Sequence, residues 1–169
     1  YLYGVSGIFS NIFSVVSTYL IVFLIFGGFL QVTGTGQFII DLALALAGKV
    51  RGGPAKVAVI ASALFGTMNG STMTNVITTG TFTIPLMKRM GYKPHFAAAV
   101  ETAASSGGQL MPPVMGTLAF LMAQLTGIPY ISIIKAAFIP ALLYYFAIFS
   151  MVDQESCRLR LKKLPKEEV

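Results

Sequence analysis

The most constraining feature of this sequence is an uncharged segment, residues 57–87, that lies between two basic ones. The basic segments read KVRGGPAK at residues 49–56 and KRMGYK at residues 88–93. In membrane proteins, loops rich in Lys and Arg lie preferentially on the cytoplasmic side. Two complete crossings need about 40 residues, whereas only about 31 are available here. In a membrane protein the chain must therefore turn back at mid-depth, and we expect residues 57–87 to form a re-entrant helical hairpin.

The composition indicates that the chain is a polytopic membrane protein. Hydrophobic residues make up 55% of it and charged residues only 11%, whereas a soluble domain is about a quarter charged. The net charge of +6 comes from clustered Lys and Arg, which indicates membrane topology rather than a nucleic-acid partner. The single Cys157 excludes a disulfide framework and a cysteine-based metal site. Because the sequence opens at Tyr1 without a basic signal region, we expect a fragment of a longer chain.

Four further segments complete the expected topology. Residues 12–30 are apolar and uncharged, and they are long enough for a scaffold transmembrane helix across about 30 Å of hydrocarbon. Residues 36–48 are too short to cross, since Phe38–Gly48 reaches only about 17 Å, and we expect an interfacial arm helix there. Residues 130–151 predict another transmembrane helix, which leads into a basic cytoplasmic tail at residues 152–169. In this topology every basic cluster lies on one side.

The centre of the hairpin, FGTMNGSTMTNVITTGTF, is polar but carries no charge. We expect helical arms at Val57–Phe65 and Thr72–Met87, with TMNGST as a non-helical tip between them. At that depth, non-helical backbone is tolerated only where it packs in protein or lines a watery cavity. On the alternative interpretation, the small and hydroxylated residues only help helices to pack closely.

A second interruption favours the first interpretation. Residues 94–126 are long enough to cross the membrane, but SSGGQLMPP at residues 105–113 divides them. Glycine favours the end of a helix, and proline suits the first turn of the next one. We therefore expect a discontinuous transmembrane helix, with half-helices at Phe96–Ser106 and Pro113–Thr126 and an unwound joint between them.

A hairpin tip and an unwound joint at the same depth bring several helix ends to one point. Helix C-termini offer free carbonyl oxygens and partial negative charge, and N-termini offer free N–H groups and partial positive charge. This arrangement suits a desolvated small cation beside an anionic substrate, which is the recurring layout of secondary transporters. Because the tip has no carboxylate, sodium fits it better than calcium.

The stretch GSTMTNVITTGTFTIPLMKRMGYKPHFAAAVETAASSGGQLMPPVMGTLAFLMA carries a resemblance to a known family. It is similar to the large membrane subunit of the tripartite ATP-independent periplasmic (TRAP) transporters, and most of all to the type in which small and large membrane subunits are fused. The resemblance implies one repeat of an inverted-repeat, elevator-type permease in a bacterial or archaeal cytoplasmic (inner) membrane. It also implies import of an organic acid delivered by a periplasmic solute-binding protein, with sodium as the coupling ion and no other cofactor. The small membrane subunit and the second repeat are the further partners that it implies.

By the same resemblance, individual residues take on roles in binding. The sodium ligands would come from the tip and the joint, namely Gly70, Ser71, Asn75, Ser106, Gly107 and Gly108. The substrate would lie near Thr72, Gln109, Pro112 and Pro113. The tip departs from the family pattern at Asn69, Met73 and Thr74, where serine or small residues are usual. Asn69 still offers an oxygen.

Glu101 is a further candidate, because an acid within a membrane segment is functional by default. We consider it a candidate coupling acid for a proton or an ion. Alternatively, it reaches Lys88 or Arg89 near the cytoplasmic face and forms an ordinary ion pair.

Two other classes of function stay open. The first is a passive channel or structural membrane subunit, which downhill flux without sodium would indicate. The second is an intramembrane serine hydrolase using Ser71, Ser105 or Ser106, but a nucleophilic serine needs a base within reach. The only histidine, His95, lies about 15 Å along the predicted helix from the joint, too far to act as that base. We therefore expect that the protein is not an enzyme.

Overall fold

The computed structural model describes residue 17 and residues 21–159, and all regular elements in this part of the chain are helices. The predicted all-α class is thereby confirmed. The helices are α2 (Ile21–Val32), α3 (Thr35–Ala47), α4 (Gly53–Asn69), α5 (Thr72–Arg89), α6 (Pro94–Gly107), α7 (Thr117–Thr126) and α8 (Tyr130–Arg158). Of the scaffold helix predicted at residues 12–30, residues 12–16 and 18–20 lie outside the described residues, and α2 covers its C-terminal part from Ile21 onward.

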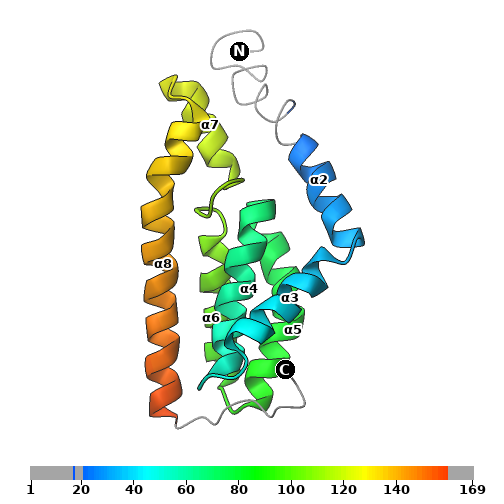
Figure 1. Cartoon of the computed structure of the whole chain (residues 1–169), viewed down its shortest axis with the longest axis vertical. Helices are drawn as coiled ribbons and strands as arrows, with labels where there is room; N and C mark the ends of the chain where they lie inside the picture. The colour runs from blue at the N-terminus through cyan, green and yellow to red at the C-terminus, as the bar shows by residue number, and fades with distance from the viewer. Residues whose placement is uncertain (1–16, 18–20, 160–169) are drawn as a thin grey trace.

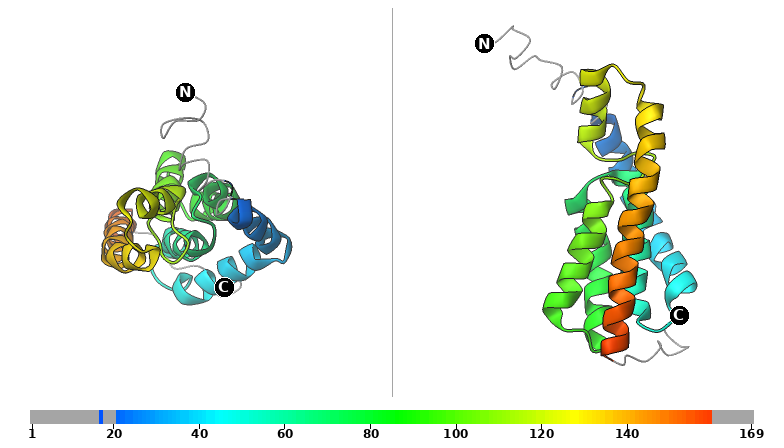
Figure 2. Two further views of the ribbon diagram at one scale, coloured as in Figure 1. Left: turned by 90° about the horizontal axis from the view of Figure 1, so that it is seen from above. Right: turned by 90° about the vertical axis from the view of Figure 1, so that its left-hand side faces the viewer.

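Helices α4, α5 and α6 pack against one another as a bundle (Figure 1). Helix α8 packs along α4 and α6 and extends beyond them, and the short α7 lies beside this extension (Figure 2). Helix α3 crosses the outside of the bundle and packs mainly on α4. The connection from α6 to α7 therefore lies between the bundle and the α7–α8 pair.

The segment predicted to be a re-entrant hairpin forms two adjacent helices, α4 and α5, with a shorter turn than expected. Helix α4 continues to Asn69 and α5 begins at Thr72, so only Gly70 and Ser71 lie between them. Gly70 adopts the left-handed conformation (φ 57°), which ends α4, and Ser71 Oγ caps α5 by accepting from the Thr74 N–H. A glycine C-cap followed at once by a serine N-cap needs no further linker. The predicted tip, TMNGST, is therefore too long.

Small side chains let the helices of the bundle approach closely. Its buried core contains alanines of α4 and α6 together with Val59, Met87, Tyr145 and Val152. A second buried cluster joins α3 to α4, where Phe65 packs among alanine, valine and isoleucine side chains. Alanine and glycine at helix contacts are typical of membrane helix packing, because they permit close approach of the backbones.

The basic segments that flank the hairpin meet at one end of the bundle. The Tyr92 hydroxyl, between α5 and α6, lies 2.6 Å from Ser156 Oγ of α8 and 3.4 Å from the Gly52 carbonyl oxygen. Lys56 Nζ, in the first turn of α4, lies 2.5 Å from Asp153 Oδ1. The loop before α4, the loop after α5 and the end of α8 therefore lie together, which is the arrangement that the hairpin topology requires.

By length and composition, α8 is the one helix in the described part of the chain that is long and apolar enough to cross a membrane. It begins at Tyr130, where the sequence predicts a span, but continues to Arg158, so residues 152–158 of the expected tail are helical. The contacts of Asp153 with Lys56 of α4 and of Ser156 with Tyr92 in the loop after α5 explain this extension, since they hold the last two turns of α8 on the bundle.

Candidate functional site

The tip of the α4–α5 hairpin packs directly against the end of α6 and the joint that follows it. Two glycines make this contact possible. A Cβ atom on Gly66 would lie 2.4 Å from the Gly108 Cα, and one on Gly70 would lie 1.7 Å from the Met115 carbonyl oxygen. Only glycine permits backbones to approach so closely. The tip and the joint thus meet, as the sequence predicts.

Asn75 lies at the centre of this contact and is fully buried. Its Nδ2 donates to the Ser62 carbonyl of α4 at 2.9 Å. The same nitrogen lies against the joint, because a Cβ atom on Gly108 would lie 2.9 Å from Asn75 Nδ2. Asn75 and Gly108, two of the predicted sodium ligands, are therefore in contact, and a third, Gly70, packs against the same joint at Met115.

The turn at the tip presents both an oxygen and an unpaired donor. Asn69 Oδ1 accepts from the Ser71 N–H at 3.0 Å, and Ser71 Oγ accepts from the Thr74 N–H at 3.4 Å. Asn69 Nδ2 is buried and has no hydrogen-bond partner within the described residues. From the sequence, the oxygen of Asn69 was the atom considered for binding. In the structure that oxygen accepts from the Ser71 N–H within the turn, and the side-chain nitrogen is the atom without a partner.

The side-chain positions of Ser106 and Gly107 face away from the tip. Ser106 is exposed, and its hydroxyl donates to the Thr102 carbonyl one turn earlier in α6 at 2.8 Å. Gly107 lies under two tyrosines of α8, and a Cβ atom there would lie 2.5 Å from Tyr144 and 2.9 Å from Tyr145. Of the three joint residues predicted as sodium ligands, only Gly108 contacts the tip.

The joint runs from residue 108 to residue 116, and α7 begins at Thr117 rather than at Pro113. The predicted helix start at Pro113 is therefore wrong. Successive prolines keep the preceding residues out of helical geometry, and Met115 adopts a left-handed conformation (φ 56°) before the helix can start. The Gly116 N–H donates to the Gln109 carbonyl at 2.8 Å and closes the joint into a loop.

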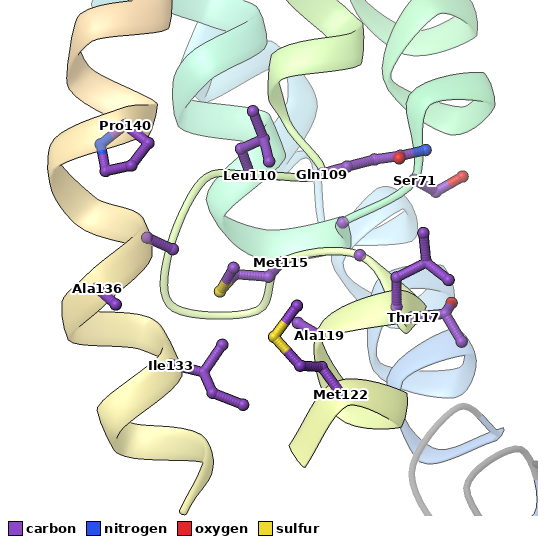
Figure 3. A pocket seen from close by; sticks show the side chains of 14 residues that line it. Ser71, Gln109, Leu110, Met115, Thr117, Ala119, Met122, Ile133, Ala136 and Pro140 are labelled. Carbon is purple, nitrogen blue, oxygen red and sulfur yellow. The ribbon is translucent and has the colours of Figure 1, made fainter. Parts of the chain in front are cut away.

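A cavity of about 710 Å³ opens beside the tip, between the joint, α7 and α8 (Figure 3). Ser71, Gln109 and Thr117 supply its polar side chains, and the rest of the lining is apolar or glycine. The Gln109 side chain extends toward Ser71 in Figure 3. Gln109, predicted to lie near the substrate, thus lines the cavity. Pro113 lies in the loop beside it, where its carbonyl accepts from the Tyr130 hydroxyl at 3.0 Å.

Glu101 lies on α6, about two helical turns before the joint, and has no exposed surface. Its carboxyl group contacts four hydroxyl groups, those of Ser62, Thr79, Thr83 and Ser105. The ion pair with Lys88 or Arg89, which was the alternative interpretation of Glu101, is not formed. In the part of the chain described, salt bridges join only Lys56 to Asp153 and Glu155 to Arg158. The hydroxyl partners were missed from the sequence, although Asn75, Thr79 and Thr83 recur at the four-residue spacing of one helix face.

Comparison with known proteins supports the family suggested by the sequence. Residues 6–169 match the model of the family described as tripartite ATP-independent periplasmic transporter, DctM component. The chain belongs to this family. Members of the DctM family are components of membrane transporters rather than enzymes, which argues against the serine hydrolase. No solved structure matches the chain.

Curated relatives carry names with different substrates. The chain is 33% identical, over 143 residues, to the C4-dicarboxylate TRAP transporter large permease protein DctM of Pseudomonas aeruginosa, covering 85% of this chain and 32% of the relative. It is 33% identical over 90 residues to the ectoine/5-hydroxyectoine TRAP transporter large permease protein UehC of Ruegeria pomeroyi, covering 53% of this chain and 21% of the relative. It is 32% identical over 91 residues to the isethionate TRAP transporter permease protein DctMQ of Oleidesulfovibrio alaskensis, covering 54% of this chain and 14% of the relative. The chain spans about a third of the first of these DctM relatives.

Proposed function

We propose that this DctM chain forms one half of a sodium and organic-acid binding site in a sodium-coupled, elevator-type importer. The observation that carries the proposal is the contact of the hairpin tip with the joint, through Gly66 on Gly108 and Gly70 on Met115. This contact gathers the C-terminus of α4, the N-terminus of α5 and the C-terminus of α6 at one point.

The ends of these helices supply complementary charges. The last carbonyl groups of α4 carry partial negative charge and suit a cation, and the first N–H groups of α5 suit a carboxylate. Ser71 and Asn75 add neutral oxygens, which favour sodium over calcium. The unpaired Nδ2 of Asn69 is a donor for an anionic group. Sodium and an organic acid would therefore bind side by side at the tip.

The arrangement of the helices fits an elevator movement. Helices α4, α5 and α6 are joined by close contacts and suit a unit that moves as one. Left-handed glycines flank α3, with Gly34 at φ 81° before it and Gly52 at φ 69° after its end, so the chain bends sharply on both sides of the predicted arm helix. We propose that α3 connects a fixed scaffold to the moving hairpin, and that the hairpin is re-entrant from the cytoplasmic side.

The complete transporter requires parts beyond this chain. We propose that a periplasmic solute-binding protein delivers the substrate, and that a second repeat completes the site from the opposite side of the bilayer. The small membrane subunit is predicted to be fused to the same polypeptide. The anionic substrates in the names of two relatives, a C4-dicarboxylate and isethionate, support an organic acid as substrate.

Uptake of substrate by the full-length parent protein in liposomes, with its binding protein present, tests this function. We expect uptake to follow an inward sodium gradient, whereas uptake indifferent to sodium would favour the passive channel. Ser71→Ala should raise the sodium concentration needed for half-maximal uptake, because it removes an oxygen at the tip. Ser106→Ala is the matched control, since the Ser106 side chain points away from the tip. Equal sodium activation in both variants would exclude the Ser71 hydroxyl as a ligand.

A further inference from the structure

The joint between α6 and α7 is a loop that is closed at its base by its own hydrogen bonds. The Gly116 N–H donates to the Gln109 carbonyl at 2.8 Å, and the Met115 N–H donates to the Met111 carbonyl at 3.2 Å. Residues 112–114 lie between these bonds and form the apex of the loop. The two prolines there have no N–H group and cannot extend the pattern. The hydrogen bonds of the loop therefore fix its base but not its apex.

Tyr130, the first residue of α8, binds this apex. Its hydroxyl oxygen lies 2.6 Å from the Val114 carbonyl oxygen and 3.0 Å from the Pro113 carbonyl oxygen, so the two carbonyl groups share its single proton. No backbone N–H of the described residues donates to either carbonyl. Irregular backbone at membrane depth needs such a partner, because lipid offers none. The tyrosine hydroxyl therefore satisfies the apex from outside the loop.

The ring of Tyr130 is itself held in place. It stacks on Phe120 of α7, with ring centroids 4.5 Å apart and an interplanar angle of 12°. It also packs against the buried cluster of Met115, Ala119 and Ile133, which connects the joint to α7 and α8. Because a tyrosine has only two side-chain torsions, a ring held in this way directs its hydroxyl group to one position.

Met115 connects the apex to the hairpin tip. It directly follows Val114 in the chain, and its left-handed conformation (φ 56°) turns the backbone there. Its side chain is buried in the cluster between α7 and α8, while its carbonyl oxygen lies against Gly70. Met115 and Ser71 both line the cavity beside the tip. A shift of the apex would therefore change the contact of joint and tip together with the wall of the cavity.

We propose that Tyr130 is a positioning residue, which holds the joint in the conformation that the sodium and organic-acid site requires. It acts through the Val114 carbonyl and the adjacent Met115, and it contacts neither ligand. Where it concerns sodium, this rests on the proposed function; where it concerns the joint, it rests on the hydrogen bonds of Tyr130. The α7–α8 pair, which lies beside the bundle of α4, α5 and α6, thereby contributes to the shape of the site at the tip.

The test is Tyr130→Phe in the full-length transporter, purified in detergent. Phenylalanine keeps the ring and its stacking on Phe120, so the substitution removes only the hydroxyl group. A ligand that binds the folded protein stabilises it by mass action. The sodium dissociation constant is therefore taken from the rise in thermal stability as sodium chloride replaces potassium chloride at constant total salt. We expect this constant to rise roughly three- to tenfold, because sodium must then order the joint that the hydroxyl no longer holds, and this range corresponds to one net hydrogen bond.

Tyr144→Phe is the matched control. It removes the same group from the same helix, but that hydroxyl binds the Ala103 carbonyl at 2.8 Å, within α6 and one turn before the joint. Tyr144→Phe should leave the sodium dissociation constant unchanged, even where it lowers the stability of the sodium-free protein. If Tyr130→Phe also lowers stability without changing the sodium constant, its hydroxyl group is only structural and the proposal is overturned.

A second measurement distinguishes failure of this proposal from failure of the proposed function. If sodium and potassium stabilise the wild type equally, the sodium-coupled function is excluded, and the role of Tyr130 in the joint is decided by hydrogen exchange. Backbone amides of residues 109–116 should exchange faster in Tyr130→Phe than in Tyr144→Phe. Equal exchange in the two variants would show that the Tyr130 hydroxyl group does not hold the joint.

Discussion

Gly70 offers the sharpest test of the contact between tip and joint. In Gly70→Ala the new side chain must occupy a left-handed backbone conformation (φ 57°), which costs about 1–2 kcal/mol for an L-residue. The added Cβ would also lie 1.7 Å from the Met115 carbonyl oxygen. This oxygen belongs to the backbone and cannot rotate away, so the joint itself must move, and such overpacking costs about 1–3 kcal/mol. We therefore expect a total loss of roughly 2–5 kcal/mol in the free energy of unfolding.

Gly127→Ala is the matched control for this substitution. Gly127 has almost the same backbone conformation (φ 69°), but no atom lies within 4 Å of a Cβ built on it. It should therefore lose only the conformational part, about 1–2 kcal/mol. The difference between the two variants measures the contact of tip and joint alone.

The measurement is the free energy of unfolding of the full-length protein in detergent micelles, obtained from reversible denaturant titration of wild type and both variants. The contact also carries the proposed binding site, so sodium-dependent uptake should fall in Gly70→Ala and persist in Gly127→Ala. Equal destabilisation of the two variants would refute the close approach of Gly70 to Met115, and the convergence of helix ends would then lose its structural basis.

Two further predictions concern the contacts that hold α8 on the bundle. Asp153→Asn should destabilise the protein by about 1–2 kcal/mol, because it leaves the buried Lys56 ammonium with a neutral partner. Lys56→Met should cost only about 0–1 kcal/mol, since the half-exposed Asp153 can rehydrate. A larger loss of stability for Lys56→Met than for Asp153→Asn in denaturant titration would contradict this account. Tyr145→Phe should cost about 1–2 kcal/mol, because it frees the buried Ala104 carbonyl that its hydroxyl binds at 2.9 Å. Tyr144→Phe is the comparison, and it should cost less because Tyr144 is only partly buried; equal thermal stabilities of the two variants would be the contrary result.

The sequence was a good guide where a local rule decides the structure. The Pro94 that starts α6, the double glycine that ends it and the GIPY turn before α8 are all read from residue types with a known conformational preference. The same rules misplaced the start of α7. Pro113 has the right chemistry for a first helical turn, but a second proline and the left-handed Met115 keep the chain irregular until Thr117.

Side-chain directions at the site were harder to predict, because they depend on how each helix is rotated about its axis. Ser105 and Ser106 are neighbours in the sequence, yet Ser105 is buried against Glu101 and Ser106 is exposed. Only the packing of α6 against both α4 and α8 determines which of the two serines is buried. The hydroxyl groups around Glu101 were predictable in part, since their four-residue spacing marks a single face of α5. Their common partner on another helix was not.

The hydrogen bonds between Glu101 and the hydroxyl groups of α4, α5 and α6 explain how one bundle can be rigid and still hold the proposed binding site. Below the tip, hydroxyl groups from three helices are bound to the buried Glu101, which makes sliding of one helix past another unfavourable because it would break several buried hydrogen bonds at once. At the tip, glycines replace these side chains and leave backbone groups close to one another. The buried hydrogen bonds and the close backbone contacts thus come from successive turns of the same helix faces. An ion at the tip would therefore not have to order the helices on binding, and the bending that an elevator movement needs would fall to the glycines on either side of α3, outside the bundle.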